Sequence, residues 1–295
     1  MDNLFIYLEL LVNGVIIGTV YGLIACGLSL IFGVGKIVNF AHGALLALGM
    51  FIVYFIQRTL AINIYLVILP AAFLMFWIGY GLQFFLIKPI IRRESGMPVL
   101  PVILLTAGIM MALENLLLMV FGSSYLTVKM DFAQGTLRIG TISLPFVRLI
   151  AFFSSLVVVA ALHFFLSRTD LGRAIRAVSQ DREKARLLGV DDHKILCITV
   201  GLGMAITTIS GGTLLPFYYV HPDIGNMFLT KCFVIVVLGG MGTISGALMG
   251  GIIVGILEVV VAQVMKVSVV QALIFLIFVL VLLLKPSGLL GTARE

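Results

Sequence analysis

The sequence predicts an all-α membrane protein, a polytopic helix bundle of about 8–9 transmembrane segments with broken, glycine-rich helices. Of the 295 residues, 61% are hydrophobic and 11% are charged, whereas a soluble domain has roughly 45–50% apolar and about 25% charged residues. The apolar residues also occur in long runs, and a helix needs about 20 of them to cross a bilayer. A water-soluble chain could not hide so much apolar surface, so the bilayer is predicted to be its solvent.

The predicted helices are bounded by the charged residues that interrupt the apolar runs. The first run lacks a preceding basic region and exceeds the roughly 7–15 apolar residues of a cleavable signal peptide, so we expect a retained transmembrane helix. The stretch 232–264 is rich in glycine and too long for one ordinary span. We expect a short or broken helix that ends near Gly240, and a second helix after it. The other spans are predicted near residues 10–32, 38–57, 62–87, 97–121, 147–166, 195–219 and 267–284.

The positions of the basic residues predict the orientation, because cytoplasmic loops collect Lys and Arg. The largest basic cluster lies within 167–194, and Lys285 marks the tail. If these segments face the cytoplasm, the loops 122–146 and 220–228 face outward. The N-terminus is then outside and the C-terminus inside, which requires an odd number of crossings and favours nine if 232–264 crosses twice.

The longest polar stretch is about 167–194, enough for one or two short helices. Its mixed charges, with alanine and leucine at helical spacing, predict a short amphipathic helix on the cytoplasmic side that stops at Gly189 as a C-cap. Anchoring to the lipid surface by basic residues is the alternative. Interleaved acids weaken attraction to anionic lipid, so a docking helix for a cytoplasmic partner fits better. These acids are Asp181, Glu183, Asp191 and Asp192.

Glycines recur at four-residue spacing, a pattern that lets helix backbones approach closely in lipid. Close packing is the favoured interpretation, and a flexible gate is the alternative. The segment 33–37 also resembles 240–244, which indicates either two repeated halves or a chance match between glycine-rich sequences. The spaced glycines are Gly14, Gly18 and Gly22 in the first helix, and Gly242, Gly246, Gly250, Gly251 and Gly255 later.

Four residues in apolar surroundings are candidates for the translocation path or gate: Asn39, His42, Gly43 and Glu258. Burying polar groups in lipid is costly, so such residues often mark a substrate path. Asn39 also suits a helix N-cap at the interface, and Glu258 also suits a buried polar contact. Both alternatives stay open for each residue.

Several other activities find no support in the sequence. The segment Gly33-Val34-Gly35-Lys36 is not a P-loop, since Leu30 stands where the first glycine belongs and Ile37 replaces the hydroxyl residue. No catalytic motif of the metalloprotease or serine-hydrolase kind occurs. The net charge of +6 needs no nucleic-acid partner, because membrane loops are basic anyway. Three widely spaced cysteines suggest neither a disulfide frame nor a metal site: Cys26, Cys197 and Cys232.

The chain resembles the branched-chain amino-acid permeases of bacterial ABC importers over nearly its whole length. It is most similar to the subunit that is usually paired with a second, related permease. Four groups of residues carry the resemblance: Gly22 to Gly33 followed by Ile37-Val38-Asn39-Phe40-Ala41-His42-Gly43; Arg173-Ala174-Ile175-Arg176-Ala177 running on to Ala185-Arg186-Leu187-Leu188-Gly189-Val190; Val237 to Ala247; and Lys285-Pro286-Ser287-Gly288-Leu289-Leu290-Gly291.

This resemblance implies that residues 1–295 form a single permease domain in the lipid of a bacterial inner membrane, with a cytoplasmic coupling region at about 167–194. It implies a heterodimer with a sibling permease, two cytoplasmic ATPase subunits and an extracytoplasmic substrate-binding protein. ATP and magnesium would then bind to the partner subunits, with no cofactor in this chain. The family's E-A-A-x-x-x-G coupling loop matches 183–189 in part, because Lys184 replaces the central alanine. The candidate coupling residues are Asp181, Arg182, Glu183, Ala185 and Gly189.

The resemblance implies a transport subunit, not an enzyme, for branched-chain or other hydrophobic amino acids. Similar permeases serve urea, amides or aromatic acids, so these substrates stay open. A secondary transporter driven by an ion gradient is a further alternative, with Glu114 and Glu258 as its thin support. In the ATP-driven case, closure of the ATPases would push or release the helix at 180–190 and tilt the helices at 147–166 and 195–219.

Overall fold

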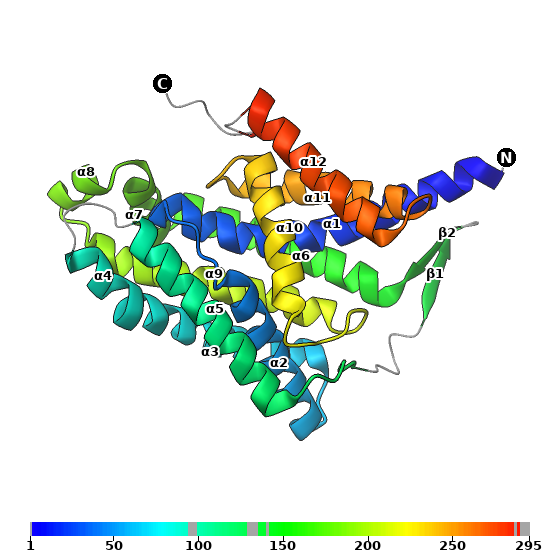
Figure 1. The fold of residues 1–295 in the computed structure, drawn as a ribbon, viewed down its shortest axis with the longest axis horizontal. Coiled ribbons are helices and arrows are strands. Elements are labelled where there is room, and N and C mark those ends of the chain that lie inside the picture. Colours follow the sequence, from blue (N-terminus) through cyan, green and yellow to red (C-terminus); the bar gives the residue numbers. More distant parts are fainter. Residues whose placement is uncertain (1, 94–98, 129–134, 140–141, 286–287, 290–295) are drawn as a thin grey trace.

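Helices make up most of the computed structural model, which describes residues 2–93, 99–128, 135–139, 142–285 and 288–289 (Figure 1). The long helices are α1 (Asp2–Gly35), α2 (His42–Leu60), α3 (Ile64–Leu82), α5 (Val99–Phe121), α6 (Phe146–Arg168), α9 (Asp192–Leu214), α10 (Ile224–Gly239), α11 (Ile244–Ala262) and α12 (Val267–Leu284). The short ones are α4 (Lys88–Arg93), α7 (Asp170–Gln180) and α8 (Arg182–Leu187), and a π-helical turn, Gln83–Ile87, joins α3 to α4.

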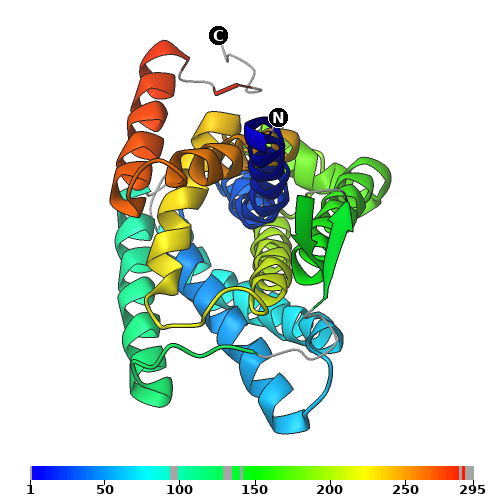
Figure 2. The same ribbon diagram turned by 90° about the vertical axis from the view of Figure 1, so that its right-hand side faces the viewer.

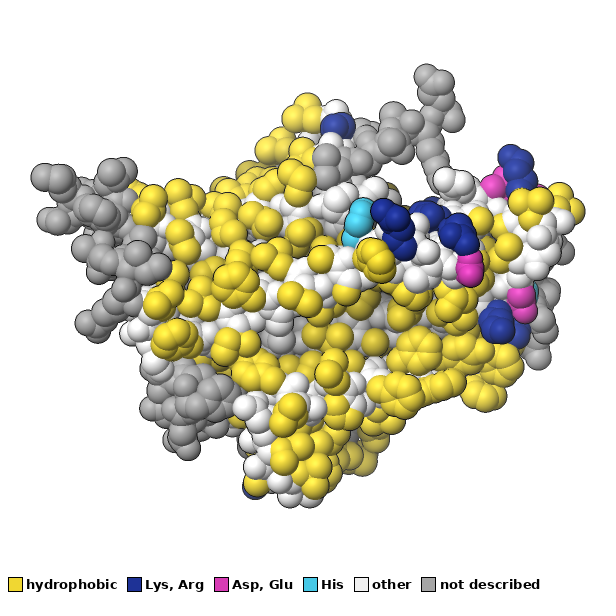
Figure 3. Space-filling model, turned by 180° about the vertical axis from the view of Figure 1, so that it is seen from behind, with side chains coloured by type: hydrophobic (Ala, Val, Ile, Leu, Met, Phe, Trp, Pro, Cys, Tyr) yellow, Lys and Arg dark blue, Asp and Glu magenta, His cyan; other side chains and the backbone are white. Residues whose placement is uncertain are grey.

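The prediction of a polytopic helical membrane protein is confirmed. Seven helices of the described chain are long and apolar enough to cross a membrane, and two shorter apolar helices accompany them, α10 and the part of α12 from Val269 to Leu284. The exact number of crossings stays a prediction. Figure 3 shows a broad hydrophobic surface on one side of the molecule, and the basic and acidic side chains gather toward one end of it.

A short antiparallel hairpin interrupts the helical pattern. Strand β1 (Thr136–Ile139) pairs with β2 (Ile142–Pro145), inside the loop that was predicted to face outward. Figure 1 places this hairpin and the N-terminal end of α1 at one end of the long axis, whereas α4, α7 and α8 lie at the other end. The start of α1 and the basic coupling region are therefore at opposite ends of the molecule, and which end faces the cytoplasm stays a prediction.

Helix α1 is the centre of the packing. Viewed down the long axis it lies among α6, α9, α10 and α11 (Figure 2), and it contacts all four. Four consecutive residues of α1, Leu23 to Cys26, are fully buried. A helix that is apolar on every side is buried on every side, and this one has the most enclosed span in the described chain.

The spaced glycines set the distance between α1 and α11. A Cβ atom on Gly251 would lie 2.4 Å from the Cα of Gly22, and one on Gly255 would lie 2.3 Å from the Cα of Gly18. These are backbone atoms, so no side-chain rotation could relieve the overlap. The close-packing interpretation of the glycines is confirmed for this helix pair.

The predicted break near Gly240 is confirmed. Helix α10 ends at Gly239 and α11 begins at Ile244, and between them Gly240 and Gly242 have φ angles of 106° and 88°. Residues other than glycine rarely adopt such angles. The two segments that resemble each other meet here, because a Cβ on Gly242 would lie 3.0 Å from the Cα of Gly33; whether they are a true repeat stays open.

The predicted start of this region at residue 232 is wrong, because α10 begins at Ile224. The predicted span begins directly after the charge of Lys231, and the predicted loop 220–228 is too long, because residues 224–228 belong to α10. Lys231 lies inside α10 with only 7% of its surface exposed, because a carboxylate on α11 pairs with it. In Figure 1 α10 runs across the direction of α1.

Candidate functional site

The coupling region contains two short helices, within the one or two that the length of the polar stretch allows, although the residue pattern predicted one amphipathic helix. Helix α7 buries Gly172, Ile175 and Val178 against the bundle. Asp181 then has an extended backbone, with φ −151° and ψ 108°, and it ends α7 and begins α8. An N-cap residue has such non-helical angles, so the aspartate that was expected inside one helix divides it into two.

Asp181 caps α8 with its side chain. Its Oδ1 accepts a hydrogen bond of 3.0 Å from the backbone N–H of Lys184, and its Oδ2 lies 3.0 Å from the Lys184 Nζ. Donation from the Lys184 N–H lowers the pKa of the Asp181 carboxyl, because the bond favours the ionised form. The cap is therefore charged at neutral pH.

The other end of α8 is closed by Gly189. Its φ of 83° lies in the left-handed region, and its N–H donates to the carbonyl of Arg186 over 3.0 Å. The next N–H, of Val190, donates to Ala185 over 3.1 Å. The predicted end at Gly189 is thus confirmed, and glycine is the residue that suits this C-terminal position.

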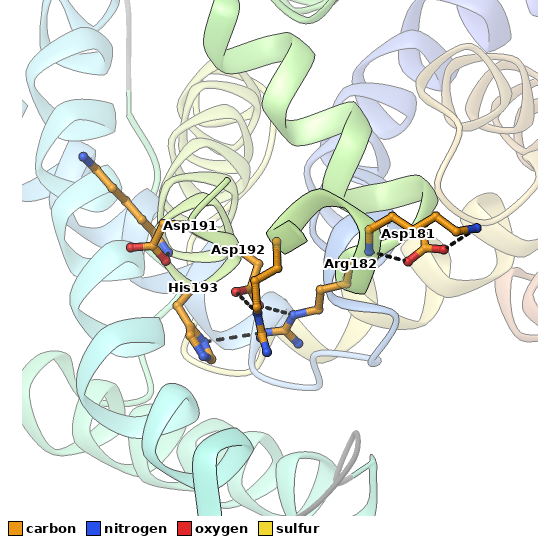
Figure 4. Close-up of polar contacts among 8 residues, drawn as sticks. Asp181, Arg182, Asp191, Asp192 and His193 are labelled. Atoms are coloured by element: carbon orange, nitrogen blue, oxygen red, sulfur yellow. Dashed lines mark hydrogen bonds and ion pairs between the residues drawn. The ribbon is translucent and has the colours of Figure 1, made fainter. Parts of the chain in front are cut away.

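A buried aspartate fastens α8 to α9 (Figure 4). Asp192, at the first turn of α9, is 2% exposed and accepts hydrogen bonds from two arginines of α8. Arg186 donates from Nε to Oδ1 over 3.1 Å and from Nη2 to Oδ2 over 2.9 Å, and Asp192 raises the pKa of Arg186. Arg182 pairs with the same carboxylate through its Nε, and its Nη2 lies 3.4 Å from His193 Nδ1.

Two leucines at the end of α8 are exposed. Leu187 is 87% exposed and Leu188 is 82% exposed, while Ala185 on the opposite face is buried. Glu183 is exposed, and a Cβ on Gly189 would meet no atom within 4 Å. The structure therefore brings all five candidate coupling residues to α8 and its two caps. The sequence did not identify Asp192 as the residue that holds this segment in place.

The candidates at the start of α2 are interior contacts. His42 is fully buried, and its Nε2 lies 3.4 Å from the Thr207 Oγ1 of α9. A Cβ on Gly43 would lie 2.2 Å from the carbonyl oxygen of Gly225, so this glycine lets α2 and α10 cross closely. These contacts place both residues where α2, α9 and α10 meet.

Asn39 is buried, but it is not the N-cap of α2. The helix begins at His42 rather than near residue 38, and Ala41 is the capping residue, without a side-chain bond. The Asn39 Oδ1 instead accepts from the N–H of Ala41 over 3.0 Å, an Asx turn that precedes the helix. Its Nδ2 and the Nδ1 of His42 are buried and have no partner in the described chain.

Glu258 is part of a polar cluster that the sequence did not reveal. Both of its carboxylate oxygens lie 2.8 Å from the Nζ of Lys231. The same Nζ donates to the Tyr21 hydroxyl over 3.1 Å, and that hydroxyl lies 3.0 Å from the Tyr218 hydroxyl. Glu258 thus makes a partly buried polar contact, and its role in the translocation path stays a prediction. Lys231, a lone charge within an apolar run, was the signal that could have predicted this pair.

Comparisons with known proteins agree on one family. A family model described as "Branched-chain amino acid transport system / permease component" matches residues 10–284. The chain is 30% identical to the high-affinity branched-chain amino acid transport system permease protein BraD of Pseudomonas aeruginosa, over 99% of this chain and 98% of that protein. It is 28% identical to the corresponding protein LivH of Escherichia coli, with the same coverage.

Two further relatives are more distant. A probable branched-chain amino acid transport permease protein of Methanocaldococcus jannaschii is 27% identical over 84% of this chain and 79% of that protein. A fructose import permease protein of Rhizobium meliloti is 33% identical, but over only 34% of this chain and 30% of that protein. No solved structure matches the chain.

Proposed function

The chain belongs to the family of branched-chain amino acid transport system permease components, and from this premise we propose that it carries branched-chain amino acids across a bacterial inner membrane. It is a multi-pass membrane permease of an ABC transport system and not an enzyme. The proposal adds the substrate, the membrane and the orientation, with the N-terminus outside and the C-terminus in the cytoplasm.

The proposed partners follow from the same family relationship. They are a related permease that completes a heterodimer, two cytoplasmic ATPases that bind ATP and magnesium, and an extracytoplasmic binding protein that delivers the amino acid. Residues 1–295 are proposed to form one permease domain. Its coupling region is about 167–194, and Asp181, Arg182, Glu183, Ala185 and Gly189 transmit the motion of the ATPases.

The observation that carries the coupling proposal is the exposed pair Leu187 and Leu188 on a firmly held α8. Exposed leucines beside charged side chains are typical of a surface that another protein covers. Because Asp192 binds two arginines of α8, a force on α8 is transmitted directly to α9. Helix α7 connects the same segment to α6, since only Thr169 separates them.

The proposed mechanism is a tilt of α6 and α9 that alternates access to the path. An ATPase shifts such an equilibrium only by binding the two states with different affinity. Movement of α9 would be felt at the start of α2, because Thr207 of α9 contacts His42. In this mechanism the translocation path opens or closes where α2, α9 and α10 meet, and Asn39, His42 and Gly43 lie at that place.

The test is a pair of matched double variants in the assembled importer. Leu187→Asp with Leu188→Asp removes the apolar surface, while Leu187→Met with Leu188→Met keeps it. We expect the aspartate variant to lose co-purification of the ATPases and ATP-dependent leucine uptake in proteoliposomes, and the methionine variant to retain both. Equal uptake by the two variants would reject the docking role of α8. Uptake that persists without ATP and collapses with an ion gradient would instead identify a secondary transporter.

A further inference from the structure

A groove of about 350 Å³ lies between α10 and α12. Its polar wall is formed by Asp223, Asn226, Thr230, Lys231 and Gln271, and apolar side chains such as Phe275 complete it. This volume and mixture of groups are typical of a site for a small molecule. Three of the polar residues, Asn226, Thr230 and Lys231, lie on α10, and Asp223 is the N-cap of that helix.

Lys231 links this groove to the buried ion pair. The Nζ of Lys231 donates to both oxygens of Glu258 at 2.8 Å and to the Tyr21 hydroxyl at 3.1 Å. The exposed fractions of the side chains are 9% for Lys231 and 25% for Glu258. All three protons of the ammonium group are thus in use, and the pair is enclosed without being fully sealed.

The charge of a ligand decides whether it can open this pair. A simple anion that binds Lys231 leaves the largely enclosed Glu258 carboxylate without a counter-charge. A simple cation that binds Glu258 leaves the buried Lys231 ammonium without one. Loss of one partner of a buried ion pair is strongly unfavourable. A ligand that carries an ammonium and a carboxylate on neighbouring atoms supplies a new partner to both groups at once.

Two carboxylates, those of Glu114 and Asp223, lie near the same groove. Glu114 of α5 interacts with Asp223 and Asn226, which line the groove, and the Glu114 Oε1 is buried without a hydrogen-bond partner in the described chain. These carboxylates repel a simple carboxylic acid, as Lys231 repels a simple amine. A zwitterion carries a group that suits each of them.

We propose that Lys231 and Glu258 determine substrate specificity, because the carboxylate and ammonium groups of an α-amino acid replace their mutual contact during transport. The inference rests on the proposed function, and it favours amino acids over the urea and amides that similar permeases carry. The apolar side of the groove, with Val234, Ile274 and Phe275, accommodates an aliphatic side chain. Selection by charge thus takes place inside the permease, after delivery by the binding protein.

The first experiment tests ligand binding without transport. Thr230→Cys introduces a thiol on the groove wall at an exposed position, whereas the three native cysteines are buried. Labelling by a maleimide is measured on the assembled complex in nanodiscs with equal concentrations of L-leucine, 4-methylpentanoate or 3-methylbutylamine. We expect leucine alone to slow the labelling several-fold. Equal protection by the acid or the amine, or no protection by leucine, would overturn the proposal.

The second experiment removes both charges together. Lys231→Met with Glu258→Gln leaves no uncompensated charge, so we expect a complex that assembles but takes up leucine at least about tenfold more slowly. Lys266→Met, which removes an exposed charge before α12, is the control and should transport normally. Normal uptake by the double variant would show that the pair is only a structural contact.

The outcomes separate this inference from the proposed function. If the unaltered importer shows no ATP-dependent leucine uptake, the proposed function itself is wrong. If the unaltered importer transports and the neutral double variant transports equally well, only the role of the ion pair is wrong. Should the double variant fail to assemble, the comparison of the three ligands on Thr230→Cys decides, because that variant leaves the ion pair intact.

Discussion

The contact between α1 and α11 gives a prediction whose size follows from the structure. In Gly251→Ala the new Cβ would lie 2.4 Å from the Cα and N of Gly22 and 2.6 Å from the carbonyl oxygen of Gly18. Carbon atoms are in favourable contact at roughly 3.5–4.0 Å, so the two backbones must separate locally by about 1 Å. No change of side-chain rotamer can relieve this overlap, because the atoms that clash belong to the main chain.

Overpacking of this kind costs about 1–3 kcal/mol. Alanine is a better helix former than glycine by up to about 1 kcal/mol, which offsets part of that cost. The matched control is Gly108→Ala in α5, where a Cβ would meet no atom within 4 Å. The control should therefore be unchanged or more stable by up to about 1 kcal/mol. Because both variants gain the same helix propensity, they should differ by the overpacking cost of about 1–3 kcal/mol.

The assay is the thermal midpoint of the purified protein in one detergent, followed as the fraction that stays monodisperse after heating. One kcal/mol corresponds to about 2–4 °C for a large domain, so Gly251→Ala should melt about 2–12 °C below Gly108→Ala. Equal midpoints would refute the reasoning, because they would show that α1 and α11 separate without loss of stability. A lower midpoint for Gly108→Ala would refute it as well.

Three further perturbations have defined outcomes. Lys231→Met alone leaves Glu258 unpaired and should destabilise the protein by about 3–5 kcal/mol in the same thermal assay, whereas adding Glu258→Gln should restore most of that loss; a single variant as stable as the double one would contradict the pairing. Asp192→Asn removes the charge that holds two arginines of α8, so binding-protein-stimulated ATP hydrolysis should persist while leucine uptake falls severalfold; unchanged uptake would show that α8 needs no such attachment. Asp181→Ala should speed trypsin cleavage within α8, whereas Asp181→Asn, which keeps an N-cap acceptor, should be cut like the unaltered protein. The pKa of the Asp181 carboxyl is lowered. The charged cap is therefore present at neutral pH and is lost only as the pH falls through that lowered pKa.

The candidate coupling segment could be predicted in place but not in detail. The polar run, its charges and Gly189 indicated a short helix at the membrane surface, because polarity and helix stop signals act over a few neighbouring residues. The division at Asp181 depends on a local cap that competes with helix continuation. The role of Asp192 depends on how α8 folds back onto α9, which no local pattern contains.

The path candidates illustrate the limit more clearly. Asn39, His42 and Glu258 stood out because polar groups are costly in lipid, and all three have places in the interior of the bundle or in its polar cluster. Lys231 was not among the candidates, because a charge that interrupts an apolar run also marks the end of a predicted helix. Its burial is explained by Glu258, 27 residues later in the chain, and by the Tyr21 hydroxyl of α1.

The sequence by itself determined that this chain is a polytopic helical membrane protein, that its long apolar helix breaks near Gly240, and that one polar segment extends from the bundle. These properties depend on composition, on run length and on residues close together in the chain. Only the tertiary structure decided that the spaced glycines join α1 to α11 and that Lys231 meets Glu258 beside a groove. Such contacts join residues far apart in the sequence. They stabilise the fold only when both surfaces, or both charges, leave lipid or water together and pack or pair with each other.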